Sequence, residues 1–214
     1  MDVNPSLRGI LVLIKPNGRA KLAPMHETKE KILQQALQFV SLYGIEALSI
    51  GQLAKDTKMS KSGLFAHFQS KEKLQIDVLL YGAQRYEDLV FRPAIAQPRG
   101  VARIRALVAG WAGWIGQSVA GDCPVLASLT ELDEKEGPVR DCVFGLMNRY
   151  LENLEKMAQI TVDVGQFRSG SDAKQIAFEL ISLLLGYQTT RKLSWTPEGS
   201  LQKSVESLIA RYST

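Results

Sequence analysis

The segment from Thr28 to about Leu74 constrains the fold more than any other part of the chain, because helical patterns follow one another in it with short connections. The first pattern has Leu33 at its edge and an apolar stripe with these members: Ile32, Ala36, Phe39, Val40 and Tyr43. Gly44 follows directly, where helices often end in a left-handed cap. The segment is therefore predicted to form three short helices and the start of a fourth.

The second and third of these helices are separated by a three-residue turn, Thr57-Lys58-Met59. Ser49 begins a Ser-x-x-Gln capping-box pattern at the start of the second helix, and Ser60 and Ser70 are placed to cap the third and the fourth. Leu64 and Phe68, four residues apart, are expected to point inward. This is the spacing of a helix-turn-helix, which presents its second helix to the major groove of DNA.

The same residues resemble the DNA-binding domain of the tetracycline-repressor-like (TetR) regulators. The matching pattern is Ile32-Leu33-x-x-Ala36, Tyr43-Gly44, Ser49-x-x-x-Leu53-Ala54 and Ser60-x-x-x-Leu64-Phe65-x-x-Phe68-x-Ser70-Lys71-Glu72-x-Leu74. Family members usually have Gly in the turn and Tyr in the recognition helix, where this chain has Lys58 and Phe65. A residue other than Gly in a left-handed conformation costs free energy. The resemblance implies a homodimer that binds DNA and is joined mainly through its last two helices.

The start of the third helix carries the side chains that we expect to contact DNA. Lys61 and Ser62 are predicted to reach bases or nearby phosphates, since Lys donates to guanine acceptors and Ser serves either role. Gly63 leaves room for close backbone approach. Phe65 either contacts sugar or a thymine methyl group, or packs in the small core. The other predicted DNA-binding residues are Ser49, Lys58, Ser60, His67 and Lys71, of which the resemblance assigns His67 and Lys71 to phosphates.

The positive charge of the chain is concentrated toward its N-terminal end. The formal net charge of the 214 residues is +4, of which residues 1–25 carry +3, residues 26–75 carry +2 and the remainder −1. An excess of this size would not alone identify a nucleic-acid-binding protein. Residues 1–25 show little helical periodicity and are expected to form a flexible arm. Alternatively, their basic side chains contact DNA, or Met25 is the natural start.

The sequence carries no signal for a metal site, a cofactor, a membrane span or an enzyme. Cys123 and Cys142 are the only cysteines and lack metal-ligand spacing, which fits a reducing cytoplasm. No apolar run is long enough to cross a bilayer. The chain has only two histidines and lacks H-E-x-x-H, G-x-S-x-G and a phosphate-binding glycine loop, so catalysis is not expected.

After Leu74 every pattern is helical, without strand alternation or a hairpin signal. The predicted helices cover residues 71–91, 98–119, 124–133, 138–160, 172–192 and 197–212, with prolines at starts and glycines near ends. The fold class is therefore all-α, with about nine helices. We expect a helix-turn-helix DNA-binding domain at residues 26–75 and a helical ligand-binding and dimerisation domain at residues 76–214.

The last two helices are predicted to form a dimer interface. The helix at 172–192 is apolar nearly all round, so one side can face its own core and the other a partner, although burial within a monomer would produce the same pattern. Dimerisation is favoured because two helix-turn-helix units can contact half-sites about 34–36 Å apart. The predicted interface residues are Phe178, Ile181, Leu185, Leu201, Val205 and Leu208.

The middle helices are candidates for a small-molecule domain. The helix at 98–119 carries Gly110, Gly113 and Gly116, and each glycine in a helix interior costs about 1 kcal/mol relative to Ala. Close helix crossing would offset that cost, and so would space for a ligand within aromatic walls. The predicted ligand-binding residues are Trp111, Trp114, Cys123, Phe144, Met147, Phe167 and Tyr187.

The run Gly121-Asp122-Cys123-Pro124 resembles the C-terminal domain of one branch of the TetR regulators. Cys123 is placed at a helix N-terminus, where the dipole lowers the pKa of a thiol. It is therefore interpreted either as a redox or electrophile sensor or as a small packing residue. An acidic run follows and is expected to be a solvated helix end rather than a cation-binding site: Glu131, Asp133, Glu134 and Glu136.

Together these features predict a transcriptional regulator, most simply a repressor that an unknown small-molecule effector releases from a palindromic operator. The alternative is a DNA-binding protein that is ligand-independent or controlled by another protein. An enzyme built on a helical bundle is the least favoured interpretation.

Overall fold

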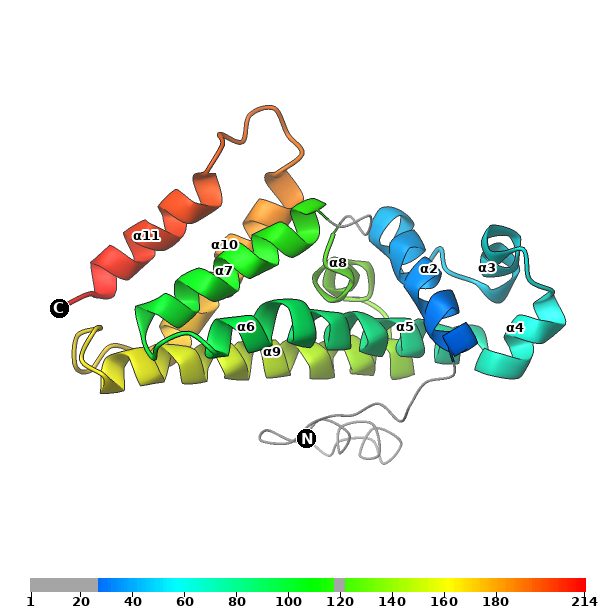
Figure 1. The fold of residues 1–214 in the computed structure, drawn as a ribbon, viewed down its shortest axis with the longest axis horizontal. Helices are drawn as coiled ribbons and strands as arrows, with labels where there is room; N and C mark the ends of the chain where they lie inside the picture. The colour runs from blue at the N-terminus through cyan, green and yellow to red at the C-terminus, as the bar shows by residue number, and fades with distance from the viewer. Residues whose placement is uncertain (1–26, 118–121) are drawn as a thin grey trace.

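The computed structural model describes residues 27–117 and 122–214, and the named elements in this part of the chain are all helices. The first three, α2 (Glu27–Tyr43), α3 (Ile50–Thr57) and α4 (Lys61–Phe68), lie together at one end of the molecule, and the C-terminus lies at the opposite end (Figure 1). The predicted arm at residues 1–25 lies outside the described residues. The remaining helices are α5 (Lys71–Tyr86), η1 (Glu87–Phe91), α6 (Arg92–Ile95), α7 (Val101–Gln117), α8 (Pro124–Glu131), α9 (Pro138–Asp163), α10 (Ala173–Thr190) and α11 (Ser200–Tyr212).

The prediction that the helix beginning at residue 71 ends at residue 91, before Arg92-Pro93, is wrong. The chain passes from α5 through the π-helical turn η1 into α6, and the N–H of Arg92 donates to the carbonyl of Glu87, five residues earlier. A proline ring clashes with the carbonyl four residues before it in a regular α-helix, so the wider turn lets the helix continue through Pro93. When this run is counted as one, the described residues contain nine helices, as predicted.

The long run of α5, η1 and α6 lies beside α9, α7 and α10 pack across this pair, and α11 packs on α7 and α10 (Figure 1). Gly110 lies where α7 crosses η1, and a Cβ there would be 3.6 Å from the Cα of Val90. Close helix crossing therefore offsets the cost of this glycine. A Cβ at Gly113 would meet nothing within 4 Å. In the described part of the chain, none of the helices combines the length and the apolar character needed to cross a membrane.

The inward face of α2 differs from the predicted stripe. Leu33 and Leu37 are buried against the core, whereas Tyr43 is 66% exposed and Phe39 is only half-buried. The rings of Phe39 and Tyr43 pack on each other instead, with centroids 4.8 Å apart. Both positions fit a helical repeat, but the buried stripe is rotated toward Leu33 because α5 and α8 cover that side.

The first turns of α5 are tied to the helices at the DNA-binding end. The buried carboxylate of Asp77 accepts a hydrogen bond from Lys29 of α2 at 2.8 Å and pairs with Lys73 one turn earlier. Gln75 donates from its amide to the carbonyl of Ile45 at 2.7 Å. The predicted domain boundary after residue 75 thus falls inside a continuous helix that packs with both parts of the molecule.

Candidate nucleic-acid interface and the helical core behind it

One face of α4 anchors this helix and the other is open to solvent. Leu64 and Phe68 are fully buried, as predicted. Lys61 and Ser62 are exposed at the start of the helix, and the ring of Phe65 is 56% exposed one turn later. Of the two positions considered for Phe65, the structure therefore shows the outward one. The exposed face of α4 offers a cation, a hydroxyl and an aromatic ring, which is a suitable set for a DNA groove.

The predicted serine caps hold the three helices in place. The hydroxyl of Ser49 accepts a hydrogen bond from the N–H of Gln52 at 3.1 Å, and that of Ser60 accepts one from Gly63 at 3.0 Å. Ser70 caps α5 in the same way, through the N–H of Lys73. Each cap satisfies an N–H that has no partner within its helix. The caps fix where α3, α4 and α5 begin, and hence how α4 is presented.

Lys58 adopts the left-handed conformation that the turn requires, with φ 56° and ψ 26°. Its side chain is exposed, so few packing contacts of the side chain compensate for the backbone strain.

Lys58→Gly is therefore expected to raise the free energy of unfolding by about 0.5–1 kcal/mol, measured by urea denaturation. Lys55→Gly is the matched control, because Lys55 is also exposed but lies in the helical part of α3. That control is expected to lose about 1 kcal/mol. A loss of stability in both variants would contradict the strain at Lys58.

The connection from α4 to α5 is also strained. Gln69 has φ 65° and ψ −38°, and the N–H of Ser70 donates to the carbonyl of Phe68 at 2.7 Å across it. These features define a γ-turn of the rare kind with positive φ. This turn could not be predicted, because Gln is not a residue that favours this conformation. The turn directs the chain from α4 into the capped start of α5.

The remaining predicted DNA-binding residues surround α4. Lys71 is exposed at the start of α5 and donates to the carbonyl of Glu46 at 2.9 Å, which places its ammonium beside the loop between α2 and α3. His67 is half-buried on the last turn of α4. The structure thus brings the predicted residues to one end of the molecule, on α4 and on the ends of the two helices flanking it.

The segment from Asp122 to Lys135 contains α8 and is called the α8 segment below. It connects this end to the rest of the molecule. The carboxylate of Glu131, at the end of α8, accepts a hydrogen bond from the N–H of Glu46 at 3.2 Å and covers Gly44. Lys135 pairs with the carboxylate of Glu46. The expectation that the acidic run is only a solvated helix end is therefore wrong for Glu131, because it docks on the loop between α2 and α3. No sequence pattern indicates this contact, because its partners are 85 residues apart.

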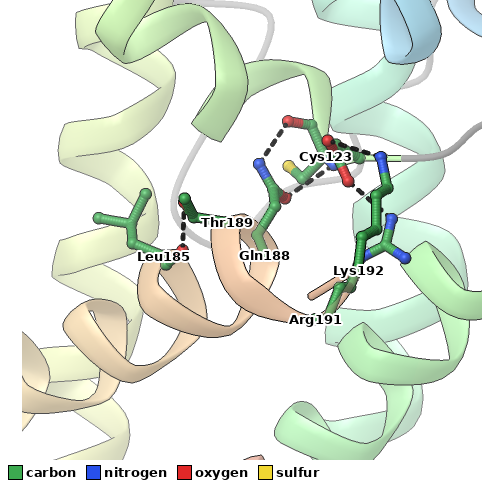
Figure 2. Close-up of polar contacts among 7 residues, drawn as sticks. Cys123, Leu185, Gln188, Thr189, Arg191 and Lys192 are labelled. Carbon is green, nitrogen blue, oxygen red and sulfur yellow. Dashed lines mark hydrogen bonds and ion pairs between the residues drawn. The ribbon is translucent and has the colours of Figure 1, made fainter. Parts of the chain in front are cut away.

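The other end of the segment is bonded to α10. Gln188 accepts a hydrogen bond from the N–H of Cys123 at 2.8 Å, and its amide lies 3.5 Å from the Cys123 carbonyl (Figure 2). Arg191 and Lys192 pair with the carboxylate of Asp122 at 2.6 and 3.3 Å. Buried Gln188 is a residue that the sequence analysis missed. The signal was a polar side chain on the apolar face of a helix.

Cys123 is a buried packing residue, and its pKa is not lowered. Burial raises the pKa of the thiol to about 11, although the N–H groups of Leu126 and Val125 and the side chain of Trp111 act in the opposite direction. The helix N-terminus is present, but desolvation of the thiolate outweighs it. The thiol is therefore protonated at neutral pH, which argues against the sensor interpretation and for the packing one.

Three of the predicted ligand-binding side chains lie around Cys123 and a cluster of aromatic rings. The rings of Trp111 and Tyr187 have centroids 6.4 Å apart, and Trp114 packs on Tyr86 at 5.9 Å. Tyr86 also packs on Tyr150, with centroids 4.5 Å apart. Tyr86 and Tyr150 were missed, because each is an ordinary aromatic residue within a helical stripe. Together these five residues are called the aromatic cluster below.

The other predicted ligand-binding residues occupy different surroundings. Met147 is buried one turn before Tyr150 on α9. Phe144 is half-buried, with the guanidinium carbon of Arg140 4.0 Å from its ring centroid. Phe167 packs against Tyr212, with centroids 6.0 Å apart, and its backbone pairs with Ser213 near the C-terminus. Placing Phe167 with the tryptophans is therefore wrong, because the loop after α9 carries it to the C-terminal end of α11.

Four of the six predicted interface residues face the interior of their own protomer. Ile181, Leu201, Val205 and Leu208 are all buried in the core of the single chain. The prediction that these four residues form the subunit interface is therefore wrong, because side chains buried in their own protomer offer no surface to a partner. Phe178, by contrast, is 63% exposed on α10, and Leu185 is partly exposed two turns later. The sequence could not separate the two faces of α10 because both are apolar.

The chain matches two family models. Residues 32–78 match the model of the tetR family of bacterial regulatory proteins, and residues 100–202 match the model of a tetracyclin repressor-like C-terminal domain. Together the two models cover the helix-turn-helix and most of the helical domain that follows it. Among curated protein sequences, none matches this chain.

Solved structures of TetR-family regulators share the fold. A regulator from Agrobacterium tumefaciens has a TM-score of 0.78 and 15% identity, covering 88% of this chain and 99% of its own. One from Chloroflexus aurantiacus has a TM-score of 0.75 and 22% identity, covering 86% and 93%. AibR, in complex with isovaleryl coenzyme A and operator DNA, has a TM-score of 0.69 and 21% identity, covering 87% and 98%. The chain belongs to the TetR family and is a DNA-binding transcriptional regulator.

Proposed function

We propose that this regulator represses transcription as a homodimer on an inverted-repeat operator and leaves the operator when a small molecule binds in its helical domain. The observation that carries the proposal is the position of the α8 segment. At Cys123 it contacts the aromatic cluster through Trp111, and at Glu131 it holds the loop between α2 and α3. A change around the aromatic rings would thus reach the helix-turn-helix through one short helix.

On the DNA side, α4 is the recognition helix. Lys61, Ser62 and Phe65 enter the major groove, and Gly63 allows the backbone to approach closely. The side chains around them contact phosphates: Ser49, Lys58, Ser60, His67 and Lys71. Phosphate contacts fix the position of the protein on the duplex, while base contacts determine sequence preference.

The dimer is built on the outer face of α10. Phe178 and Leu185 supply its apolar side chains, and a Cβ at Gly186 would meet nothing within 4 Å, so a partner helix can approach closely there. Ser182 and Thr189 lie on the same exposed face. Two copies joined in this way would present two α4 helices to half-sites about 34–36 Å apart.

Release by a ligand is a shift between two arrangements of the DNA-binding ends. A ligand changes DNA affinity only if it binds one arrangement more tightly than the other. AibR, which shares this fold, has been crystallised with both a ligand and operator DNA, which supports a comparable role for this chain. In our proposal, the bound ligand moves α8, and Glu131 transfers the movement to Gly44 and Glu46.

The test is a gel-shift titration with an operator fragment, in which candidate compounds and cell extract fractions are added to the full chain. An active compound is expected to lower DNA affinity in the wild type. The Glu131→Ala variant is expected to bind DNA but to respond less to the same compound. If no fraction or compound changes DNA affinity, the ligand-responsive part fails, and the protein is a ligand-independent or protein-controlled DNA binder.

Lys71→Ala is expected to weaken binding to all DNA sequences and to reduce the slope of log K against log salt by about one unit. The reason is that one phosphate contact is lost, and each contact releases about one counterion. Lys71→Arg keeps the charge and is the matched control, with an unchanged slope. Fluorescence anisotropy at four salt concentrations measures both. An unchanged slope in Lys71→Ala would contradict the phosphate contact.

A further inference from the structure

The aromatic cluster is assembled by rings from four helices that are distant in sequence. Tyr86 ends α5, Trp111 and Trp114 lie on α7, Tyr150 lies on α9 and Tyr187 on α10. Tyr86 is central, because its ring contacts both Trp114 and Tyr150. Aromatic rings of this kind attract another flat apolar ring, which packs on them at offset-stacked or edge-to-face angles.

The cluster contains one polar atom that the protein does not satisfy. Tyr150 is 7% exposed, and its hydroxyl is buried without a hydrogen-bond partner among the described residues. Buried hydroxyls in native proteins are nearly always paired, with protein, water or ligand. Burial and the nearby Cys123 thiol raise the pKa of Tyr150 well above its usual value. This hydroxyl therefore keeps its proton at neutral pH and is available as a donor.

The charges next to the cluster compensate each other. Glu87 directly follows Tyr86 in sequence, and Arg149 directly precedes Tyr150. Each of the two charges affects the pKa of the other group. Burial raises the pKa of Glu87 and lowers that of Arg149, so both environments disfavour charge. A ligand with a net charge would bring a further charge into this apolar region and would have to be desolvated to enter it.

We propose that the aromatic cluster binds an uncharged ring compound that carries a carbonyl-type oxygen, and that the Tyr150 hydroxyl donates a hydrogen bond to that oxygen. This inference rests on the ligand-responsive function proposed above and assigns a chemical class to the ligand. A carbonyl oxygen satisfies the unpaired hydroxyl, the ring packs on Trp114 and Tyr86, and no charge is buried.

The test compares three small probes of similar size on the full chain: acetophenone, ethylbenzene and benzoate. Acetophenone has the ring and the acceptor, ethylbenzene lacks the acceptor, and benzoate adds a charge. Isothermal titration calorimetry is expected to show acetophenone binding about five- to tenfold tighter than ethylbenzene, the range of one net hydrogen bond. Benzoate is expected to bind more weakly than both.

Tyr150→Phe is the decisive variant. It removes the unpaired hydroxyl and keeps the ring, so its thermal midpoint is expected to equal or exceed that of the wild type. The preference for acetophenone over ethylbenzene should disappear, with ethylbenzene affinity unchanged. Tyr81→Phe is the matched control, because it removes a hydroxyl from a buried tyrosine of α5 that lies outside the aromatic cluster, and it should keep the preference.

Several results would overturn the inference. These are equal affinities for acetophenone and ethylbenzene in the wild type, tightest binding of benzoate, a preference that survives in Tyr150→Phe, or no measurable binding of any probe. A lower thermal midpoint in Tyr150→Phe would show that the hydroxyl has a partner in the protein and would also overturn it. If acetophenone binds in a Tyr150-dependent way but leaves DNA affinity unchanged in the gel shift, the ligand class stands and operator release by this site fails.

Discussion

Phe178→Glu is expected to leave the purified protein monomeric and to lower its affinity for an operator with two half-sites by about 10²–10⁴-fold. Phe178 is the most exposed apolar side chain on α10 and lies at the N-terminal half of the proposed dimer face. A dimer would place two carboxylates close together on an apolar surface, where burial of a charge is strongly unfavourable. Without the second subunit, the second half-site contributes nothing to binding.

The control for this prediction is Leu89→Glu. Leu89 is 47% exposed on η1, so the substitution adds the same charge to an apolar surface position away from α10. Analytical ultracentrifugation and fluorescence anisotropy measure the two outcomes, and circular dichroism shows whether the helical content is retained. Because Phe178 is exposed, the protomer should remain folded. A Phe178→Glu protein that is still dimeric and binds the operator normally would contradict the proposed face.

Gly44→Ala is expected to lower the free energy of unfolding by about 2 kcal/mol. Gly44 has φ +84°, which costs a residue with a Cβ about 1 kcal/mol. The new Cβ would also lie 2.6 Å from both carboxylate oxygens of Glu131. Glu131 must then swing away and lose its hydrogen bond with the N–H of Glu46, which contributes about another 1 kcal/mol.

Two comparisons separate these contributions. Gly165→Ala has the same kind of backbone strain, with φ +75°, but a Cβ there meets nothing within 4 Å, so only about 1 kcal/mol should be lost. In a double-mutant cycle, Gly44→Ala and Glu131→Ala should be less than additive, because both remove the same hydrogen bond. Urea denaturation monitored by circular dichroism measures the change in free energy of unfolding for the three single variants and the double variant. Full additivity would show that Glu131 does not hold the loop at Gly44.

The helix-turn-helix could be predicted from sequence because its determinants are local. Ser49, Ser60 and Ser70 each cap a helix three residues before the N–H that they accept from, and the structure shows all three bonds. The position of the turn at Lys58 was predicted. The structure shows that Lys58 adopts the left-handed conformation, which costs a residue other than Gly free energy. The π-helical turn was not predictable, because a proline usually marks the end or start of a helix.

The helical domain was predictable in its elements but not in its contacts. Apolar stripes on α10 and α11 indicate burial without saying whether a core or a partner covers them, so Leu201 and Val205 were assigned to the wrong surface. The pKa of Cys123 depends on burial by other helices, which the local helix N-terminus does not reveal. The contact between Tyr86 and Tyr150 joins residues 64 positions apart, and no short pattern encodes it.

Selection of bound duplexes from a random pool, with the full chain at low salt, is the most direct measurement on the central claim that two copies of α4 contact successive major grooves. We predict enrichment of an inverted repeat whose half-sites are centred about 10 base pairs, or a multiple of that spacing, apart. Lys61→Ala should change the preferred bases within each half-site. Enrichment of no sequence, or of a single unrepeated site bound by one subunit, would contradict the account.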